Sequence, residues 1–263
     1  MDKNIKFKFA LYTVACFFSL VFFTNFGVSQ EKQTPKIKMT VNRGVIKPIS
    51  IAVPAFVKEQ GGNSIVSREL AKVISNNLNG TGLFKTIAQI AYIDTPISFN
   101  SPVKFDNWSI INADVLVVGA VGINFDGRLE VKFRLWDVSL QKEIGKGKKY
   151  LTKGESWRRI SHKISDTIYE RLTGESPYFD SRVVFVSETG PKNNRTKRLA
   201  IMDQDGANFR FLKHPPSLVI APRFSPTDNK IIFTGYETGR PNVYLMNLDN
   251  DKISSLDNLV GMS

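Results

Sequence analysis

Apolar residues recur at steps of three and four between Trp157 and Leu172, near the middle of the chain. This spacing gathers them into one stripe along a helix. Gly174 follows the last of them, where a left-handed C-cap is expected, and Pro177 prevents the helix from continuing. The segment Arg182–Ser187 is then β-branched and aromatic, which is typical of a strand. The pattern predicts that one domain ends on this helix and that a second, all-β unit begins on this strand.

Strand and helix patterns alternate before this point. Lys36–Val41 alternates apolar and polar residues, as a half-buried strand does. Ile49–Phe56 is an almost continuous apolar run and predicts a buried strand that ends at its proline. Val66–Leu78 carries a helical stripe that ends at Gly80, and we expect Asn63 or Ser64 as its N-cap.

The next segment predicts a short helix followed by a hairpin. The helix covers Trp108–Ala113, and the fully apolar run Val115–Val118 is the first strand. Glycines at Gly119–Gly122 and the pair Asp126-Gly127 mark the turn, and Leu129–Val138 alternates as the second strand. With one more strand at residues 150–151, the order β-α-β-β-β-α predicts a mixed sheet with helices packed on it, over residues 30–174.

Repetition is the main feature of the remaining residues. Arg182–Ser187 and Lys230–Gly235 are similar strands 48 residues apart, and Glu-Thr-Gly follows each of them. Each copy continues into a second strand, a turn and a third short strand, at Leu199–Asp203 and Phe209–Leu212 in the first copy and at Val243–Asn247 and Lys252–Leu256 in the second. Repeats of this length with several short strands are typical of propeller blades.

The repeats are too few for a closed propeller. Residues 178–263 make about two blades, whereas closed propellers carry about four to eight. We therefore expect an incomplete all-β propeller over residues 182–263, joined to the α/β domain by a linker at 175–181. The chain resembles the front portion of a longer protein.

The first 29 residues predict a cleaved secretory signal peptide. Residues 1–8 are basic, Phe9–Phe23 is apolar, and small residues at Gly27–Ser29 suit a cut after Ser29. The apolar run is short for a membrane span, which needs about 20 residues. An uncleaved anchor and a lipoprotein modified at Cys16 are the alternatives. We expect an exported, soluble protein whose mature form lacks cysteine.

Charge and motifs argue against nucleic-acid binding and against catalysis. The net charge is +12, but the lysines and arginines are spread along the chain without a nucleic-acid-binding motif. No P-loop, zinc-protease or nucleophile-elbow motif occurs, and we expect no catalytic residue, metal ion, cofactor or small-molecule substrate. His162 is expected at the helix surface or boundary. Asp203–Gly206 is interpreted as a hairpin turn in preference to a calcium loop.

Four segments carry a resemblance to a known family. The run His162–Glu188 is similar to the junction between the N-terminal domain and the propeller of the TolB family, and Ala221–Pro226 resembles that family's blade motif. Asn112–Gly119 and Ile51–Phe56 resemble its first domain. The similarity extends from about residue 36 to the end. Two features depart from the pattern: the blade turn at Ser225–Asn229 lacks the usual Ser-Pro-Asp-Gly, and about two blades are present where the family has six.

The resemblance implies a non-enzymatic adapter of the periplasmic Tol-Pal system. Members link the inner-membrane protein TolA to the peptidoglycan-associated lipoprotein Pal, and they support outer-membrane integrity and constriction at cell division. The segment after the signal peptide contacts TolA, and the propeller face binds Pal, whose surface would be largely missing here. By this resemblance the TolA-binding residues are Gln30, Lys36, Ile37, Lys38, Met39, Thr40 and Val41.

Three alternatives remain open. Lys36–Val41 could be an ordinary edge strand, although an exposed edge can itself bind a partner by strand addition. The chain could be the propeller-bearing part of a peptidase related to prolyl oligopeptidases, without its hydrolase domain. It could also be an inactive, truncated member of the TolB family.

Overall fold

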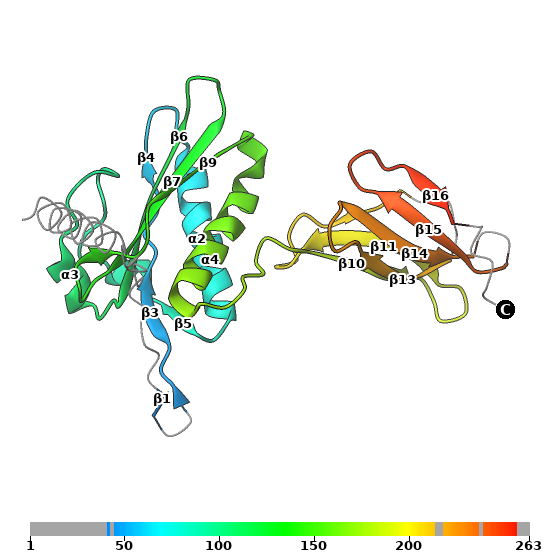
Figure 1. Ribbon diagram of the computed structural model, residues 1–263, viewed down its shortest axis with the longest axis horizontal. Coiled ribbons are helices and arrows are strands. Elements are labelled where there is room, and N and C mark those ends of the chain that lie inside the picture. Colours follow the sequence, from blue (N-terminus) through cyan, green and yellow to red (C-terminus); the bar gives the residue numbers. More distant parts are fainter. Residues whose placement is uncertain (1–40, 43–44, 214–217, 237–238, 257–263) are drawn as a thin grey trace, which may run out of the picture. The chain divides into compact units, whose positions relative to one another are not determined.

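The computed structural model describes residues 41–42, 45–213, 218–236 and 239–256. These residues form a mixed α/β portion that is followed by two antiparallel β-sheets (Figure 1). The two sheets do not close into a ring among the described residues. The predicted fold class, an α/β domain followed by an incomplete propeller, is confirmed.

A mixed seven-stranded sheet forms the centre of the α/β portion. Its main path runs β5-β3-β6-β7-β8, with β4 paired to β6 and β9 paired to β7. The pairs of β3 with β5 and β6, and of β4 with β6, are parallel, and the others are antiparallel. The strands are β3 (Ile49–Ala52), β4 (Val57–Lys58), β5 (Phe84–Thr86), β6 (Val115–Ile123), β7 (Leu129–Asp137), β8 (Lys142–Glu143) and β9 (Lys148–Thr152).

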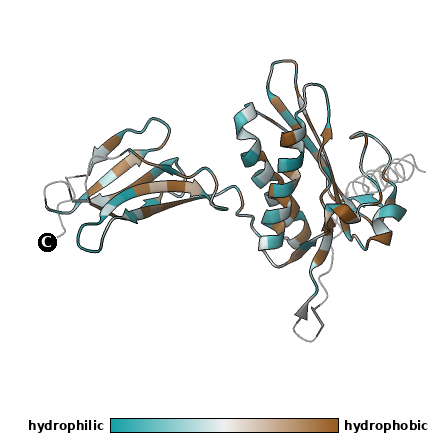
Figure 2. Cartoon of the chain, turned by 180° about the vertical axis from the view of Figure 1, so that it is seen from behind, coloured by the Kyte–Doolittle hydropathy of each residue, from teal (hydrophilic) through white to brown (hydrophobic). Residues whose placement is uncertain are grey.

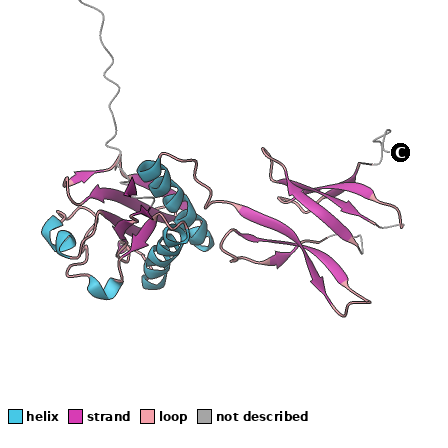
Figure 3. Cartoon of the chain, turned by 90° about the horizontal axis from the view of Figure 1, so that it is seen from below, coloured by secondary structure: helices cyan, strands magenta, loops and turns pink. Residues whose placement is uncertain are grey.

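Two long helices, α2 (Ser64–Gly80) and α4 (Trp157–Thr173), lie side by side on one face of this sheet (Figures 1 and 3). The main core lies between them and the sheet, because both helices direct an apolar stripe inward. The short helix α3 (Phe105–Ile110) contributes Trp108 to a smaller apolar cluster. Two 3₁₀ turns complete the portion, η1 (Gln89–Ala91) and η2 (Gly154–Ser156).

The ends of both long helices agree with the sequence. Asn63 caps α2, since its side-chain oxygen accepts a hydrogen bond from the backbone N–H of Ile65 at 2.7 Å. Gly174 ends α4 in the left-handed conformation, with φ 77°, and its N–H donates to the carbonyl of Glu170. A residue with a β-carbon would be strained there, which explains the glycine.

The predicted turn at Gly119–Gly122 is wrong, because β6 continues through both glycines to Ile123. The glycines serve close packing instead. A β-carbon on Gly119 would lie within 2.6 Å of the buried Phe56 ring, and one on Gly122 would lie 3.1 Å from the carbonyl oxygen of Gln60. The reversal occurs at residues 124–128, so the prediction of a turn at Asp126-Gly127 is confirmed.

Other differences in the α/β portion are small. The strands β4 and β5 were not predicted, since two- and three-residue strands are too short to show a pattern. The short helix α3 begins at Phe105, earlier than the predicted Trp108. The described part of the chain contains no helix long and apolar enough to cross a membrane.

Two β-sheets follow, and Figure 3 shows them as the all-strand part of the chain. We call them the first sheet and the second sheet. The first sheet has three strands, β10 (Arg182–Thr189), β11 (Thr196–Asp203) and β12 (Arg210–Phe211). The second sheet has four, β13 (Val219–Phe224), β14 (Lys230–Gly235), β15 (Asn242–Asn247) and β16 (Ile253–Ser255). The predicted repeat therefore appears as two antiparallel sheets. The second sheet also contains β13, a strand that the periodicity did not predict.

The two sheets pack face to face around a second apolar core. Its buried members come from both sheets, and four partly buried residues pack against it, namely Val184, Val186, Phe224 and Ile253. Apolar residues run along these strands (Figure 2), and in β14 and β15 buried positions alternate with less buried ones, as expected when each strand points alternate side chains into the core.

A β-bulge in β13 leads to a stability prediction. The register of β13 against β14 shifts between Ile220 and Arg223, and Ala221 takes φ 51°. This left-handed conformation costs a residue with a β-carbon roughly 1 kcal/mol. We expect Ala221→Gly to raise the free energy of unfolding by up to about 1 kcal/mol. Ala200→Gly, in the buried middle of β11, should lower it. Urea unfolding tests the pair, and a loss of stability in both variants would contradict the prediction.

Candidate functional site

Only one of the predicted partner-binding residues lies within the described part of the chain. Gln30, Lys36, Ile37, Lys38, Met39 and Thr40 lie outside it. Val41 begins β1 (Val41–Asn42), which pairs antiparallel with β2 (Val45–Ile46), Val41 opposite Ile46. The partner-binding role of this segment stays a prediction.

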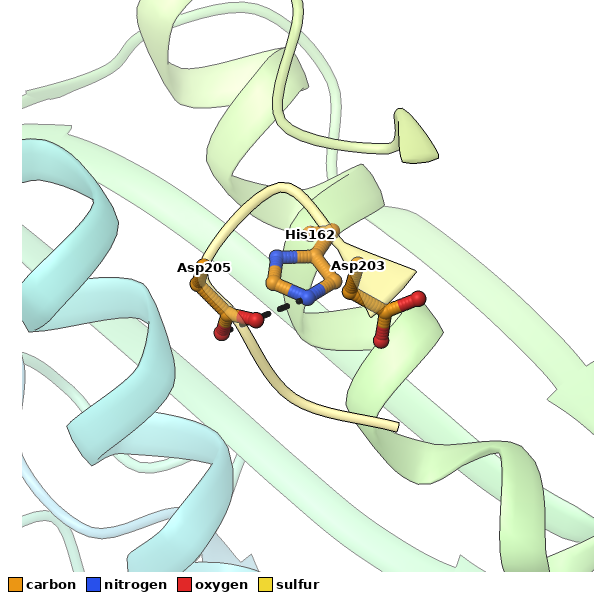
Figure 4. A group of neighbouring side chains, drawn as sticks. All are labelled: His162, Asp203 and Asp205. Carbon is orange, nitrogen blue, oxygen red and sulfur yellow. Dashed lines mark ion pairs between the residues drawn. The ribbon is translucent and has the colours of Figure 1, made fainter. Parts of the chain in front are cut away.

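A polar cluster lies where α2, α4 and the turn after β11 meet (Figure 4). Its central member, His162 on α4, is only 2% exposed, so the prediction of a surface or boundary position is wrong. Asn77 on α2 is also buried, and its amide nitrogen lies 2.9 Å from Nδ1 of His162. Two buried polar side chains on neighbouring helices therefore satisfy each other.

The hydrogen bonds around Asn77 fix the direction of this contact. The Ser165 hydroxyl donates to the carbonyl of Ser161, so it accepts from the Asn77 amide nitrogen at 2.9 Å. Gln204, in the turn after β11, donates to the Asn77 amide oxygen at 3.1 Å. The Asn77 nitrogen is thus the donor toward His162, and neutral His162 accepts at Nδ1 and carries its proton on Nε2.

The other side of His162 faces Asp205. Nε2 of His162 lies 3.7 Å from the Asp205 carboxylate, which also forms an ion pair of 2.5 Å with the guanidinium of Arg158. Arg158 and His162 are four residues apart on α4 and therefore share a helix face. The same turn thus meets the helices at two positions, through the Gln204 amide and the Asp205 carboxylate.

Asp205 makes stability depend on pH. Burial acts to raise the pKa of its carboxyl group, but the Ala207 N–H and the Arg158 guanidinium outweigh burial, and the pKa is lowered. Because the pKa is lower in the folded than in the unfolded state, ionised Asp205 stabilises the fold above the unfolded value, about 3.9. This contribution is lost as the pH falls through the folded pKa. Asp166 acts in the opposite sense, since burial raises its pKa.

We therefore expect Asp205→Asn to flatten the acid side of the stability profile. The free energy of unfolding of the wild-type chain should fall as the pH drops below about 4. In the variant it should fall less over the same pH range. Asp251→Asn, in the turn before β16, is the control and should follow the wild type. Urea midpoints measured across this range test the prediction, which fails if Asp205→Asn and Asp251→Asn give parallel profiles.

His162, Asp203 and Asp205 could in principle hold a metal ion, because one ligand atom from each lies within 4.8 Å of the others. Their hydrogen bonds favour another role. Nε2 of His162 carries a proton and so offers no lone pair. Asp205 is paired with Arg158, and Asp203 accepts a hydrogen bond of 2.5 Å from the Asn208 amide. The predicted hairpin turn at 203–206 is confirmed by the hydrogen bond from Gly206 N–H to the Asp203 carbonyl. We interpret the cluster as a structural junction.

An open cleft of about 780 Å³ adjoins the junction, lined by residues from α4, the first sheet and the turn between β13 and β14. Four arginines line it, at positions 158, 159, 182 and 210, together with the four carboxylates Glu155, Asp180, Asp203 and Asp228. Arg159 pairs with Asp180 at 3.1 Å. This balance of charge gives the cleft no strong preference for anions or cations.

The sequence did contain a signal for the junction. In α2, Asn77 comes seven residues after Leu70 and so continues the stripe of buried apolar positions with a polar side chain. In α4, Ser161 and Ser165 interrupt the buried face in the same way. Buried polar groups are almost always hydrogen-bonded, so polar residues on the inner faces of two adjacent helices predict a shared network.

Family models match both portions of the chain. Residues 37–144 match the TolB amino-terminal domain, and residues 169–263 match the TolB beta propeller domain. Together these ranges cover well over half of the 263 residues.

Individual relatives agree with the family models. The Tol-Pal system protein TolB of Dinoroseobacter shibae is 47% identical over 236 residues, which is 89% of this chain and 53% of the relative. The protein of the same name from Cereibacter sphaeroides is 49% identical over 222 residues, 84% of this chain and 50% of the relative. The crystal structure of TolB from Acinetobacter baumannii superimposes with a TM-score of 0.65 at 25% identity, over 80% of this chain and 49% of that one.

The chain therefore spans about half the length of the relatives that it matches. The similarity to these relatives covers most of the chain, at close to half of the positions compared. It also agrees with a fold in which a mixed α/β domain precedes propeller-type sheets. This chain belongs to the TolB family.

Proposed function

We propose that the chain is a non-enzymatic adapter of a Tol-Pal-like system in the periplasm. It binds protein partners and supports outer-membrane integrity and constriction at division. The observation that carries the proposal is the high identity, across both portions, to relatives that are named Tol-Pal system proteins. Since the chain spans about half of those relatives, the partners of the whole protein are part of the proposal.

The proposal assigns the first contact to the segment that follows the leader. Gln30 and Lys36–Val41 would bind a TolA-like inner-membrane protein. The alternating pattern of this segment supports binding as an added strand, since main-chain hydrogen bonds then give affinity and alternate side chains give specificity. The described end of the segment, at Val41, is already in a strand.

A second contact, with a Pal-like lipoprotein, belongs to the propeller face in the family. We propose that the two sheets of this chain form part of such a face. We further propose that residues 1–29 are a signal peptide, residues 30–174 the α/β domain, 175–181 a linker and 182–263 the partial propeller. Both proposals follow from the sequence pattern and the family resemblance.

The test is recovery of partners from a cell-envelope extract. Residues 30–263, the form expected after removal of the leader, are immobilised and the bound proteins are identified by mass spectrometry. We expect a TolA-like protein to be recovered. The matched control starts at residue 42 and should recover much less of it. Hydrolysis of a peptide ester by the pure chain, or equal recovery by both forms, would contradict the proposal.

A further inference from the structure

One lateral edge of the seven-stranded sheet is formed by β8 and β9. The strand β6 pairs along the whole of β7 on one side, and β8 and β9 pair with the other side of β7. No strand in the described part of the chain pairs with the far side of β9. An edge strand of this kind presents backbone N–H and C=O groups to which an extended peptide can add as a further strand.

The loop between β8 and β9, residues 144–147, is held in place by α4. The Arg171 guanidinium donates to the carbonyl of Ile144 at 3.0 Å and to the carbonyl of Lys146 at 2.6 Å. Gly145 has φ 70°, and a β-carbon there would lie 2.9 Å from Arg171. The loop therefore needs little ordering when a ligand binds, which lowers the entropic cost of binding.

This loop and the face of β7 that points away from α2 and α4 line an open groove of about 340 Å³. Phe99 forms part of its wall, and Glu143 is the one carboxylate among the described residues that line it. Five lining residues are basic, namely Lys132, Arg134, Lys146, Lys148 and Lys149. The groove thus differs from the cleft beside the junction, where arginines and carboxylates balance.

Two of the five basic residues are already paired with carboxylates. The Lys132 ammonium lies 2.8 Å from the Glu59 carboxylate and 3.2 Å from the Glu130 carboxylate. The Lys149 ammonium lies 3.5 Å from Glu130. These pairs neutralise one part of the groove, so the remaining basic side chains carry its excess of positive charge.

Arg134 and Lys146 form no ion pair with any carboxylate in the described part of the chain. The Arg134 guanidinium lies over the Phe99 ring, 4.7 Å from its centroid. A stacked guanidinium keeps the N–H groups in its plane available, and it can bind a carboxylate through two parallel hydrogen bonds. Lys148 instead points toward α4, where its ammonium donates to the Thr167 hydroxyl at 3.2 Å. Arg134 and Lys146 are therefore the groups best placed to bind an anion in the groove.

We propose that this edge and its groove bind an extended acidic segment of a protein partner. The main chain of the segment adds to β9 as a strand, and carboxylates on alternate residues lie on the side of the sheet that carries Arg134 and Lys149. Only a peptide uses the open backbone and the basic groove together, which favours it over an anionic membrane. The lysines also disfavour pairing with the equally basic edge of a second copy. Neither contact proposed above involves β9, so this site goes beyond them.

Fluorescence anisotropy tests the proposal on residues 30–263, with a fluorescein-labelled peptide in which glutamate and threonine alternate. We expect saturable binding that weakens as salt is added, since the side-chain contacts are between charges. The same peptide with lysine in place of glutamate should not bind. Hydrogen–deuterium exchange should slow in β9 when the acidic peptide is bound and stay unchanged in β5, the strand at the opposite edge.

Two results of these measurements would overturn the proposal. One is absence of binding by the acidic peptide, including the case in which vesicles of anionic lipid bind in its place. The other is binding of the peptide without slower exchange in β9.

Substitutions locate the binding in the groove. Arg134→Gln and Lys146→Gln are each expected to lower the affinity for the acidic peptide by about tenfold. Arg134→Lys should recover only part of the loss, because an ammonium group lacks the planar fork of a guanidinium. Lys85→Gln removes the same charge from an exposed position of β5 and is the control, which should bind like the wild type. Because Lys146 is exposed, its variant keeps the test valid even if Arg134→Gln does not fold. Wild-type affinity in Lys146→Gln, or an equal loss in Lys85→Gln, would contradict the proposal.

Discussion

Asn77→Ala is expected to lower the free energy of unfolding by roughly 2 to 4 kcal/mol. The substitution leaves the His162 ring, the Ser165 hydroxyl and the Gln204 amide without their shared partner. His162 and Ser165 are buried. The Ser165 hydroxyl keeps its hydrogen bond to the Ser161 carbonyl, whereas Nδ1 of His162 loses its partner, and a buried polar group without a partner costs about 1 to 3 kcal/mol. This is one of the two largest effects that we expect from a single substitution.

The neighbouring residue provides the control. Asn76 is the same residue type on the same helix, but its side chain is exposed, so Asn76→Ala should change stability by less than about 0.5 kcal/mol. Urea unfolding followed by tryptophan fluorescence measures the difference. Equal stability of the two variants would show that the network around Asn77 contributes nothing.

The network also predicts how unfolding is coupled along the chain. All three tryptophans, Trp108, Trp136 and Trp157, come before β10. Their fluorescence reports on the α/β portion, whereas far-ultraviolet circular dichroism reports on both portions. The turn after β11 is tied to α2 through Asn77, so the two signals should diverge more in Asn77→Ala than in the wild type.

The second large effect is expected at Gly119. In Gly119→Ala the new β-carbon falls within 2.6 Å of the Phe56 ring, and Phe56 is itself fully enclosed. The ring cannot turn away without displacing its neighbours in the core. Overpacking of this kind typically costs about 1 to 3 kcal/mol, and we expect the upper end of that range.

Gly80→Ala, at the end of α2, is the matched control, since no atom beyond its chain neighbours and its own helix backbone lies within 4 Å of the position that its new β-carbon would occupy. Alanine is the better helix former, so this variant should gain up to about 1 kcal/mol. Combining Gly119→Ala with Phe56→Leu should restore part of the lost stability, because the smaller side chain leaves room for the methyl group. If Gly119→Ala behaves like Gly80→Ala in urea unfolding, the close contact with Phe56 does not limit this position.

Much of the fold could be predicted because its elements are long and periodic. The helices α2 and α4 show their stripes and caps directly, down to Asn63 and Gly174. The alternation of β7 and the duplicated strands of the two sheets were equally clear. Short strands such as β5 depend on partners far away in the chain, so no local pattern shows them.

The errors have a common physical cause, which is packing between distant segments. Gly119 was interpreted as a turn residue, because glycine usually marks turns, whereas Phe56 requires it inside a strand. His162 comes two residues after Ile160 on the helix, which predicts a surface or boundary position, whereas Asn77 holds it in the interior. In both cases the deciding neighbour lies far away in the sequence, where periodicity carries no information.

The adapter role is tested most directly by the affinity of the chain for the periplasmic part of a TolA-like protein, measured by isothermal titration calorimetry. Residues 30–263 should bind, and the double variant Ile37→Ser, Met39→Ser should lose most of the affinity, since these side chains lie on one side of the expected strand. Lys38→Ser, Thr40→Ser alters the alternate positions and should retain more of it. Absence of binding by the unaltered chain, or equal binding by all three proteins, would contradict the account.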